Sequence, residues 1–185
     1  MSTTRRVPRS YRGAADAAPR GVRGGQYVAD VLSEDAVVFV IGMRFNRWRR
    51  IRSWWPVFTG MPRMLAELQE RDAGLLGART FWSGRTLMVV QHWRSAEELG
   101  AYARDPGFRH ARAWGEFNKR AAATGDVGIY HETYVVPRDR IETRYANMPA
   151  FGLAAAHAGR PRGVPAPRTA ADDRLGSTEP EYADE

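Results

Sequence analysis

The sequence predicts an α+β fold in which helices cover one face of a four-stranded antiparallel sheet. Four segments have the apolar runs or alternation of β-strands, and stretches with a helical period lie between them. Two of the strands are separated by a short turn that contains glycine, which predicts an antiparallel hairpin. The expected order is strand, helix, strand, strand, helix, strand, which is the ferredoxin-like βαββαβ arrangement.

A strand over residues 36–45 and a helical region over about 47–71 form the first half of this unit. Both faces of the strand are apolar, and the helical region has apolar residues at intervals of three and four. These residues are Trp54, Phe58, Met61, Leu65 and Leu68. Pro56 and Pro62 are expected to kink or restart the helix, because proline has no backbone N–H to donate.

The second half begins with strands over residues 75–82 and 85–93, joined by Ser83 and Gly84. Ser95 and Glu98 then form a capping box, in which the two side chains satisfy free backbone donors at a helix start. This pattern predicts a short helix that ends near Arg104.

A further helix is expected from Pro106 to about Thr124, with Asp105 as its cap, before a last strand over residues 127–136. Alternation along this strand places His131 and Glu132 on opposite faces. Buried polar groups need partners, because an unsatisfied one costs about 1–3 kcal/mol. The strand is therefore expected to lie beside a hydrogen-bond network or a polar cavity.

The strands are apolar on both faces, although helices cover only one face of such a sheet. We expect a second copy of the sheet to cover the other face, which gives a homodimer with stacked sheets. The segment over residues 138–153, folded back, is the alternative cover.

Residues 1–34 are expected to form a basic N-terminal arm without regular structure, and residues 159–185 a tail of the same kind. The domain then spans residues 35–158, including a C-terminal segment that could act as a lid or strap. The net charge is +7, but Lys119 is the single lysine, so the excess of arginine indicates a compositional bias. We therefore expect no nucleic-acid partner.

The chain has no cysteine, which excludes disulfides and thiolate chemistry and gives no support for an oxidising compartment. Arg5 and Arg6 resemble the start of a twin-arginine signal, but no apolar run of signal-peptide or membrane-spanning length follows. The expectation is a cytoplasmic protein without a membrane partner.

Three blocks of sequence resemble a known family. They are RSWWPVFTGMPRMLAEL at 52–68, the segments VQHWRS, AYAR and HARAWGEFN between residues 90 and 118, and GIYHETY at 128–134 followed by YANMPAFGL at 145–153. Together they are similar to the monooxygenase-like family of bacterial and fungal proteins related to the antibiotic-biosynthesis monooxygenases. The resemblance covers roughly residues 35–155 and implies a dimeric α/β barrel with a pocket between sheet and helices.

Two histidines are candidate catalytic residues. His110 is expected to share a helical stripe with Trp114, Phe117 and Ala121, where an imidazole could act as a general base towards a phenolic or enolic substrate. Asn118 and His131 could polarise the site. In the alternative interpretation, both imidazoles are structural and hydrogen-bond to the backbone or across the dimer.

Aromatic residues could form the wall of a pocket for a flat, apolar ligand, although the same residues suit an ordinary core. The candidate substrate-binding residues are Trp54, Phe58, Trp93, Trp114, Asn118 and Tyr145. The histidine spacing predicts no metal site, and no glycine-rich nucleotide fingerprint occurs.

These observations lead to the hypothesis of a monooxygenase, with secondary metabolism as one setting. It would act on an apolar or aromatic small molecule, with a histidine base and no tightly bound cofactor. One alternative is a haem enzyme in which His110 or His131 is the axial ligand. The other is a non-catalytic dimer that binds a small molecule.

Overall fold

The computed structural model describes residues 18–29, 35–108, 115, 117 and 123–157. The chain divides into two compact units. One unit spans Asp35–Val136, and the other combines described residues from before and after it.

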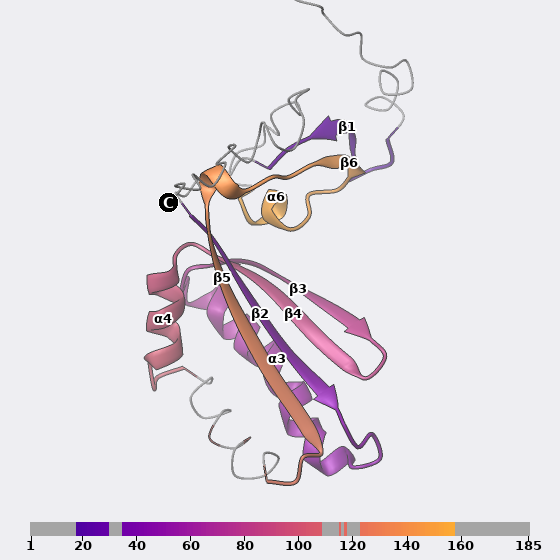
Figure 1. Ribbon diagram of the computed structural model, residues 1–185, viewed down its shortest axis with the longest axis vertical. Coiled ribbons are helices and arrows are strands. Elements are labelled where there is room, and N and C mark those ends of the chain that lie inside the picture. The colour runs from indigo at the N-terminus through magenta and orange to yellow at the C-terminus, as the bar shows by residue number, and fades with distance from the viewer. Residues whose placement is uncertain (1–17, 30–34, 109–114, 116, 118–122, 158–185) are drawn as a thin grey trace, which may run out of the picture. The chain divides into compact units, whose positions relative to one another are not determined.

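The larger unit is an α+β domain with the ferredoxin-like order of elements (Figure 1). Its strands are β2 (Asp35–Phe45), β3 (Leu75–Ser83), β4 (Thr86–Trp93) and β5 (Val127–Pro137), of which Pro137 is counted with the smaller unit. They form a sheet in the order β3-β4-β2-β5. The β2–β4 and β3–β4 pairs are antiparallel, as the sequence predicts.

Helix α3 (Ile51–Glu70) is continuous through both Pro56 and Pro62, so the predicted restart does not occur. Each proline removes a single backbone hydrogen bond, and packing of the apolar stripe against the sheet compensates for the loss. Leu68 is 2% exposed and lies in a core cluster with Val37 and Trp93. Figure 1 shows α3 running along one face of the sheet.

Helix α4 (Ala96–Arg104) begins where the sequence predicts, and the Ser95 hydroxyl accepts a hydrogen bond from the Glu98 N–H at 3.1 Å. The other half of the predicted capping box does not form, because the Glu98 carboxylate accepts from the Arg94 guanidinium at 2.9 Å instead. Residues 106–108 form a turn instead of the expected first turn of the next helix. In that turn the Asp105 carboxylate accepts from the Gly107 N–H at 2.7 Å. Gly115 and Phe117 are helical, and the remainder of residues 109–122 lies outside the described residues.

The β3–β4 hairpin turns at Gly84 and Arg85, one residue later than predicted, with Ser83 and Thr86 as the closing pair. Gly84 has a φ of +54°, the left-handed region that the first position of such a turn requires.

Both helices pack on the same face of the sheet, which we call the helix-facing side. Residues of α4 contact Val37 and Trp93, and residues of α3 contact Met43, Phe45 and Leu87. The other face, which we call the open side, carries the cross-strand pairs Val38–His92, Val40–Val90 and Gly42–Met88.

The smaller unit contains a two-stranded sheet, which contradicts the prediction that residues 1–34 lack regular structure throughout. Strand β1 (Arg23–Tyr27) pairs with β6 (Tyr145–Met148), and helix α6 (Leu153–Ala156) follows. The Tyr27 ring stacks on Tyr145 at 4.9 Å, and its hydroxyl donates to the Met148 and Pro149 carbonyls. Strand β1 forms because β6, which is far along the sequence, supplies backbone hydrogen-bond partners. The composition of residues 1–34 alone does not predict this pairing.

None of the helices in the described ranges has the length and apolar character needed to cross a bilayer.

Candidate functional site

A group of aromatic side chains surrounds Phe45 at the end of β2. Phe45 is fully buried, and the rings of Trp48, Trp54 and Trp82 lie at 4.7, 4.9 and 5.6 Å from it. Phe58, one helical turn after Trp54, contacts the same set. We call these five residues the aromatic cluster. It forms because α3 directs Trp54 and Phe58 towards the sheet at the end of β2.

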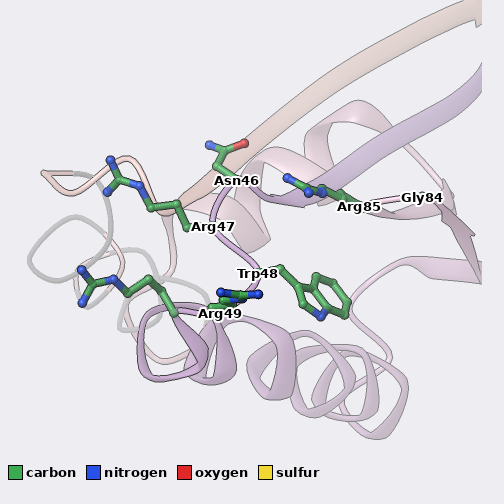
Figure 2. A pocket seen from close by; sticks show the side chains of 7 residues that line it. Asn46, Arg47, Trp48, Arg49, Gly84 and Arg85 are labelled. Atoms are coloured by element: carbon green, nitrogen blue, oxygen red, sulfur yellow. The ribbon is translucent and has the colours of Figure 1, made fainter.

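An open hollow of about 670 Å³ lies beside the aromatic cluster (Figure 2). It is lined by two turns, the one between β2 and α3 and the one between β3 and β4. The lining residues are Asn46, Arg47, Trp48, Arg49, Arg50, Gly84 and Arg85. Figure 2 shows Trp48 and Arg85 on two sides of the hollow. Its charged side chains are all arginines.

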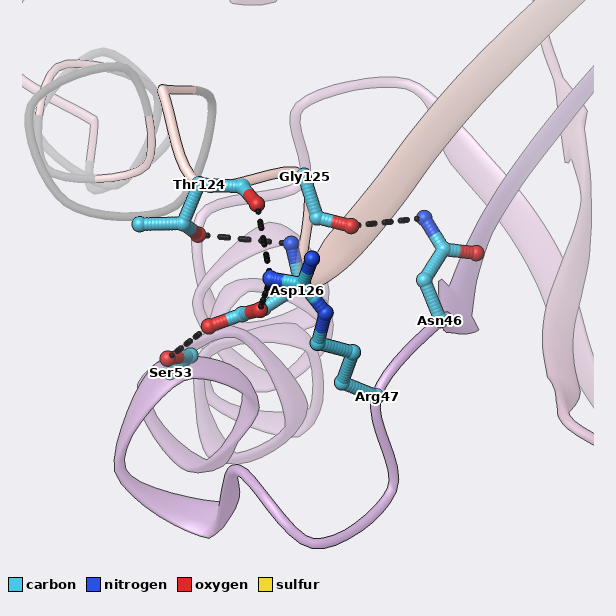
Figure 3. Close-up of polar contacts among 6 residues, drawn as sticks. All are labelled: Asn46, Arg47, Ser53, Thr124, Gly125 and Asp126. Atoms are coloured by element: carbon cyan, nitrogen blue, oxygen red, sulfur yellow. Dashed lines mark hydrogen bonds and ion pairs between the residues drawn. The ribbon is translucent and has the colours of Figure 1, made fainter.

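A polar network attaches the β2–α3 turn to the start of β5 (Figure 3). The Asp126 carboxylate accepts hydrogen bonds from the Ser53 hydroxyl and from the Arg47 guanidinium, both at 2.8 Å. Arg47 also donates to the Thr124 carbonyl, and Asn46 donates to the Gly125 carbonyl. The hydrogen bond from Ser53, together with those from Arg47, lowers the pKa of Asp126 below its ordinary value. The carboxylate is therefore held in its charged form.

A second group of residues lies on the helix-facing side, towards the other end of β2. Phe39 pairs with Gln91 of β4, and the His131 imidazole of β5 lies 5.8 Å from the Phe39 ring. Gln91 is buried, and its side-chain oxygen accepts from the Trp93 indole N–H at 3.0 Å. His131 is exposed. We call Phe39, Gln91, Trp93 and His131 the imidazole row.

The structure divides the predicted site residues that it describes between these places. Trp54 and Phe58 belong to the aromatic cluster, whereas Trp93 and His131 belong to the imidazole row. Phe39 and Phe45 are six residues apart on β2, so the two groups are separated by about 20 Å along the sheet. A small ligand does not span that distance.

The other predicted site residues lie elsewhere. Tyr145 belongs to the smaller unit, where it stacks on Tyr27 and its hydroxyl accepts from the Ala154 N–H. His110, Trp114 and Asn118 lie outside the described residues. Their roles stay predictions.

Gln91 and the arginines of the hollow are not among the site residues that the sequence predicts. A polar Gln91 in an apolar strand was a usable signal, because such a side chain needs a partner when buried. The run Arg47-Trp48-Arg49-Arg50, which follows the first strand after Asn46, is a second signal in the sequence that could have indicated these site residues.

Comparison with solved structures shows similarity in fold. An aldoxime dehydratase, OxdRE, solved with butyraldoxime, has 15% identity and a TM-score of 0.50. The match covers 63% of this chain and 38% of that one, so this chain corresponds to a part of the dehydratase.

Two smaller proteins are matched over nearly their whole length. A protein of unknown function from Bacteroides thetaiotaomicron, described as a possible oxidoreductase, has 17% identity and a TM-score of 0.39 over 56% of this chain and 99% of its own. A dimeric ferredoxin-like protein from an uncultured marine organism has 14% identity and a TM-score of 0.35 over 60% of this chain and 95% of its own.

No curated protein matches the chain. A family model does match, over residues 36–153, which include the whole four-stranded sheet and both helices that pack on it. The chain belongs to the monooxygenase af470-like family.

Proposed function

We propose that this protein is a monooxygenase that acts on an apolar or aromatic small molecule at the imidazole row. The observation that carries the proposal is the position of His131, an exposed imidazole beside Phe39 on the helix-facing side of the sheet. Family membership supports the reaction class. The proposed substrate is electron-rich and becomes reactive towards dioxygen when it loses a proton.

In this mechanism the protein supplies a base and an orientation. An imidazole titrates near neutral pH, so it can accept a proton from a phenol or an enol. The Phe39 ring offers an apolar face on which a flat substrate can stack. The Gln91 side chain accepts a hydrogen bond from the Trp93 indole, which holds both side chains in place next to Phe39. Gln91 therefore acts as a positioning residue.

His110 remains the second candidate base, proposed from its position in the helix that the sequence predicts before β5. The two histidines can be separated by kinetics. Substitution of the base is expected to lower kcat by about 10²–10⁴-fold and to remove the limb of the pH profile that reports its ionisation. Substitution of a histidine that only contacts the substrate is expected to change KM more than kcat.

The experiment is a screen of phenolic and enolic compounds by oxygen consumption, with wild type, His131→Ala and His110→Ala. His157→Asn is a matched control, because this imidazole belongs to the smaller unit and not to the imidazole row. Circular dichroism confirms that each variant is folded. Unchanged turnover in both His131→Ala and His110→Ala would remove histidine from the mechanism.

A tightly bound cofactor is not part of this proposal. Haem, the alternative, needs an axial imidazole beside an apolar slot wide enough for the porphyrin. Among the described residues, no histidine lines the hollow, and the imidazole row offers the His131 ring on an exposed strand. This arrangement does not favour haem. An absorption spectrum of freshly purified protein without a Soret band is the expected result, and a Soret band would establish the alternative.

We also propose that the protein is a homodimer that buries the open side of the sheet. That side carries Val38, Val40 and Val90 in the centre and the exposed rings of Phe81 and Tyr130 around them. Monomeric proteins rarely expose apolar patches of this extent. A second sheet stacked on this side would remove it from water.

A further inference from the structure

Three apolar side chains at the start of α3 are exposed although they are large. Trp48, Ile51 and Trp55 are 45, 56 and 53% exposed. Ile51 and Trp55 are four residues apart on the helix and therefore lie on one side of it. Trp48 stacks on Trp54 at 5.7 Å, and Trp54 contacts Trp55 at 5.9 Å, so the three side chains belong to one continuous surface.

Arginines alternate with these apolar residues. Arg49, Arg50 and Arg52 are exposed, and Arg85 lies across the hollow from Trp48. No ion pair joins these four arginines to a carboxylate in the part of the chain that the structure describes. We call Trp48, Arg49, Arg50, Ile51, Arg52 and Trp55 the arginine–tryptophan surface.

The electrostatic field at this surface is positive. The sequence has no acidic residue between Ala36 and Ala66, and none between Ala73 and Ala96. The carboxylate that the structure does place beside the turn is Asp126, which is 4% exposed and already bound to Arg47 and Ser53. It therefore does not neutralise the other arginines.

We propose that the arginine–tryptophan surface binds the face of an anionic lipid membrane. Tryptophan prefers the boundary between headgroups and acyl chains, because its ring is apolar and its N–H is polar. Ile51 can enter the acyl region beside the two indoles. The arginines can pair with lipid phosphates and are attracted by a negative surface potential.

This binding mode is peripheral, so it needs no helix that spans the bilayer. The exposed start of α3 would lie in the plane of the membrane–water interface. The imidazole row, about 20 Å away along β2, would lie outside the surface that contacts the membrane. The assignment does not depend on the proposed monooxygenase activity. It would give the protein access to apolar molecules dissolved in the membrane.

Two other occupants fit this surface less well. Single-stranded nucleic acid also pairs with arginines and stacks on indoles. It makes no use of an exposed aliphatic side chain between the tryptophans, which Ile51 provides. A second copy of this chain presents the same arginines, and like charges would face each other at a two-fold contact.

The test is co-sedimentation of the full chain with vesicles of phosphatidylcholine, with and without about one-third phosphatidylserine. Wild type is expected to bind the anionic vesicles more tightly than the neutral ones and to lose binding as salt is raised, because salt screens the attraction. Quenching of tryptophan fluorescence by brominated acyl chains is expected on binding. Absence of binding to anionic vesicles at low salt would overturn the proposal.

Two double variants separate charge from apolar contact. Arg49→Gln/Arg52→Gln is expected to weaken binding about 25-fold, because each arginine near an anionic surface contributes about fivefold. Arg49→Lys/Arg52→Lys is expected to keep most of the binding to anionic vesicles, because lysine keeps the positive charge. Ile51→Ala/Trp55→Ala is expected to weaken binding about tenfold and to reduce the lipid quenching, since Trp48 is then the indole left at the surface.

The matched control for charge is Arg104→Gln/Arg144→Gln, since these exposed arginines lie on α4 and in the smaller unit and are not part of the surface. It is expected to bind like wild type. Equal loss in this control and in Arg49→Gln/Arg52→Gln would show an effect of net charge alone and would overturn the site. Alanine favours helix, so Ile51→Ala/Trp55→Ala should fold, which circular dichroism checks.

Two further readouts identify the other occupants. A lower molecular mass of Ile51→Ala/Trp55→Ala in light scattering would assign the surface to a second copy. Tighter binding to a single-stranded oligonucleotide than to anionic vesicles, lost in Arg49→Gln/Arg52→Gln, would assign it to nucleic acid. Either result would overturn the membrane assignment.

Discussion

The Tyr130 ring of β5 lies directly over Gly42 of β2 on the open side of the sheet. A Cβ atom at position 42 would overlap with Cε1 of Tyr130 and would lie 2.7 Å from its Cζ. The absence of a side chain at Gly42 therefore permits the ring to lie flat across the neighbouring strand. Aromatic residues often cover a strand glycine in this way, which protects the backbone from water.

We expect Gly42→Ala to destabilise the protein by about 1–2 kcal/mol, because the added methyl group forces Tyr130 to move. The ring is 37% exposed, so it can turn towards solvent, which limits the cost. Chemical denaturation of Gly42→Ala, Tyr130→Ala and the double variant measures the coupling between the two positions. Strict additivity of the two effects would contradict the contact.

The imidazole row contains a buried hydrogen bond whose loss should be measurable. Gln91→Leu keeps the approximate size of the side chain but leaves the Trp93 indole N–H without its acceptor, which we expect to cost about 1–3 kcal/mol. In a Trp93→Phe background there is no N–H to satisfy, so the same substitution should cost less. Thermal or chemical unfolding gives both values. Equal costs in the two backgrounds would show that the hydrogen bond is not stabilising.

The sequence predicted those elements whose signals are local. The four strands of the larger unit begin and end within a few residues of their predicted bounds, because alternation and turn residues lie within the segments themselves. The start of α4 with Ser95 as its cap was predicted for the same reason. The continuity of α3 through Pro56 and Pro62 was not, because tertiary packing compensates for the lost backbone bonds.

Relationships between distant segments were harder to predict. Strand β1 exists because β6 pairs with it, and Tyr27 and Tyr145 are more than one hundred residues apart. Trp54 and Trp93 were assigned to one pocket because both are aromatic, yet they pack at opposite ends of the sheet. Residue type alone does not give a position along a strand.

The network at Asp126 predicts a dependence of stability on acid pH. Its pKa is lower in the folded state than in the unfolded chain, so its contribution is present above the unfolded pKa. That contribution is lost as the pH falls below about 4 towards the folded pKa. In Asp126→Asn this part of the pH dependence should be absent, and the free energy of unfolding at neutral pH should be lower.

Asp72→Asn is the matched control for the acid experiment. Asp72 pairs with Arg94 at 2.8 Å, but its side chain is 83% exposed, so solvent screens the interaction. Urea unfolding from pH 7 to pH 3 gives the curves. Parallel curves for wild type and Asp126→Asn would show that the network does not hold the carboxylate in its charged form.

The proposed dimer can be tested at the centre of the open side, where Val40 pairs with Val90. A carboxylate at position 40 would be buried between two sheets without a partner, which is costly. Val40→Glu is therefore expected to be a monomer at concentrations where wild type is a dimer, as measured by light scattering or sedimentation. The substituted side chain can reach water in the monomer, because Val40 is only half-buried in the single chain.

Val135→Glu provides the same chemical change elsewhere on the sheet. Val135 is 48% exposed and lies on the helix-facing side with His131, so this variant should remain dimeric. If wild type is monomeric, or if Val40→Glu keeps the mass of wild type, the open side is not a subunit interface.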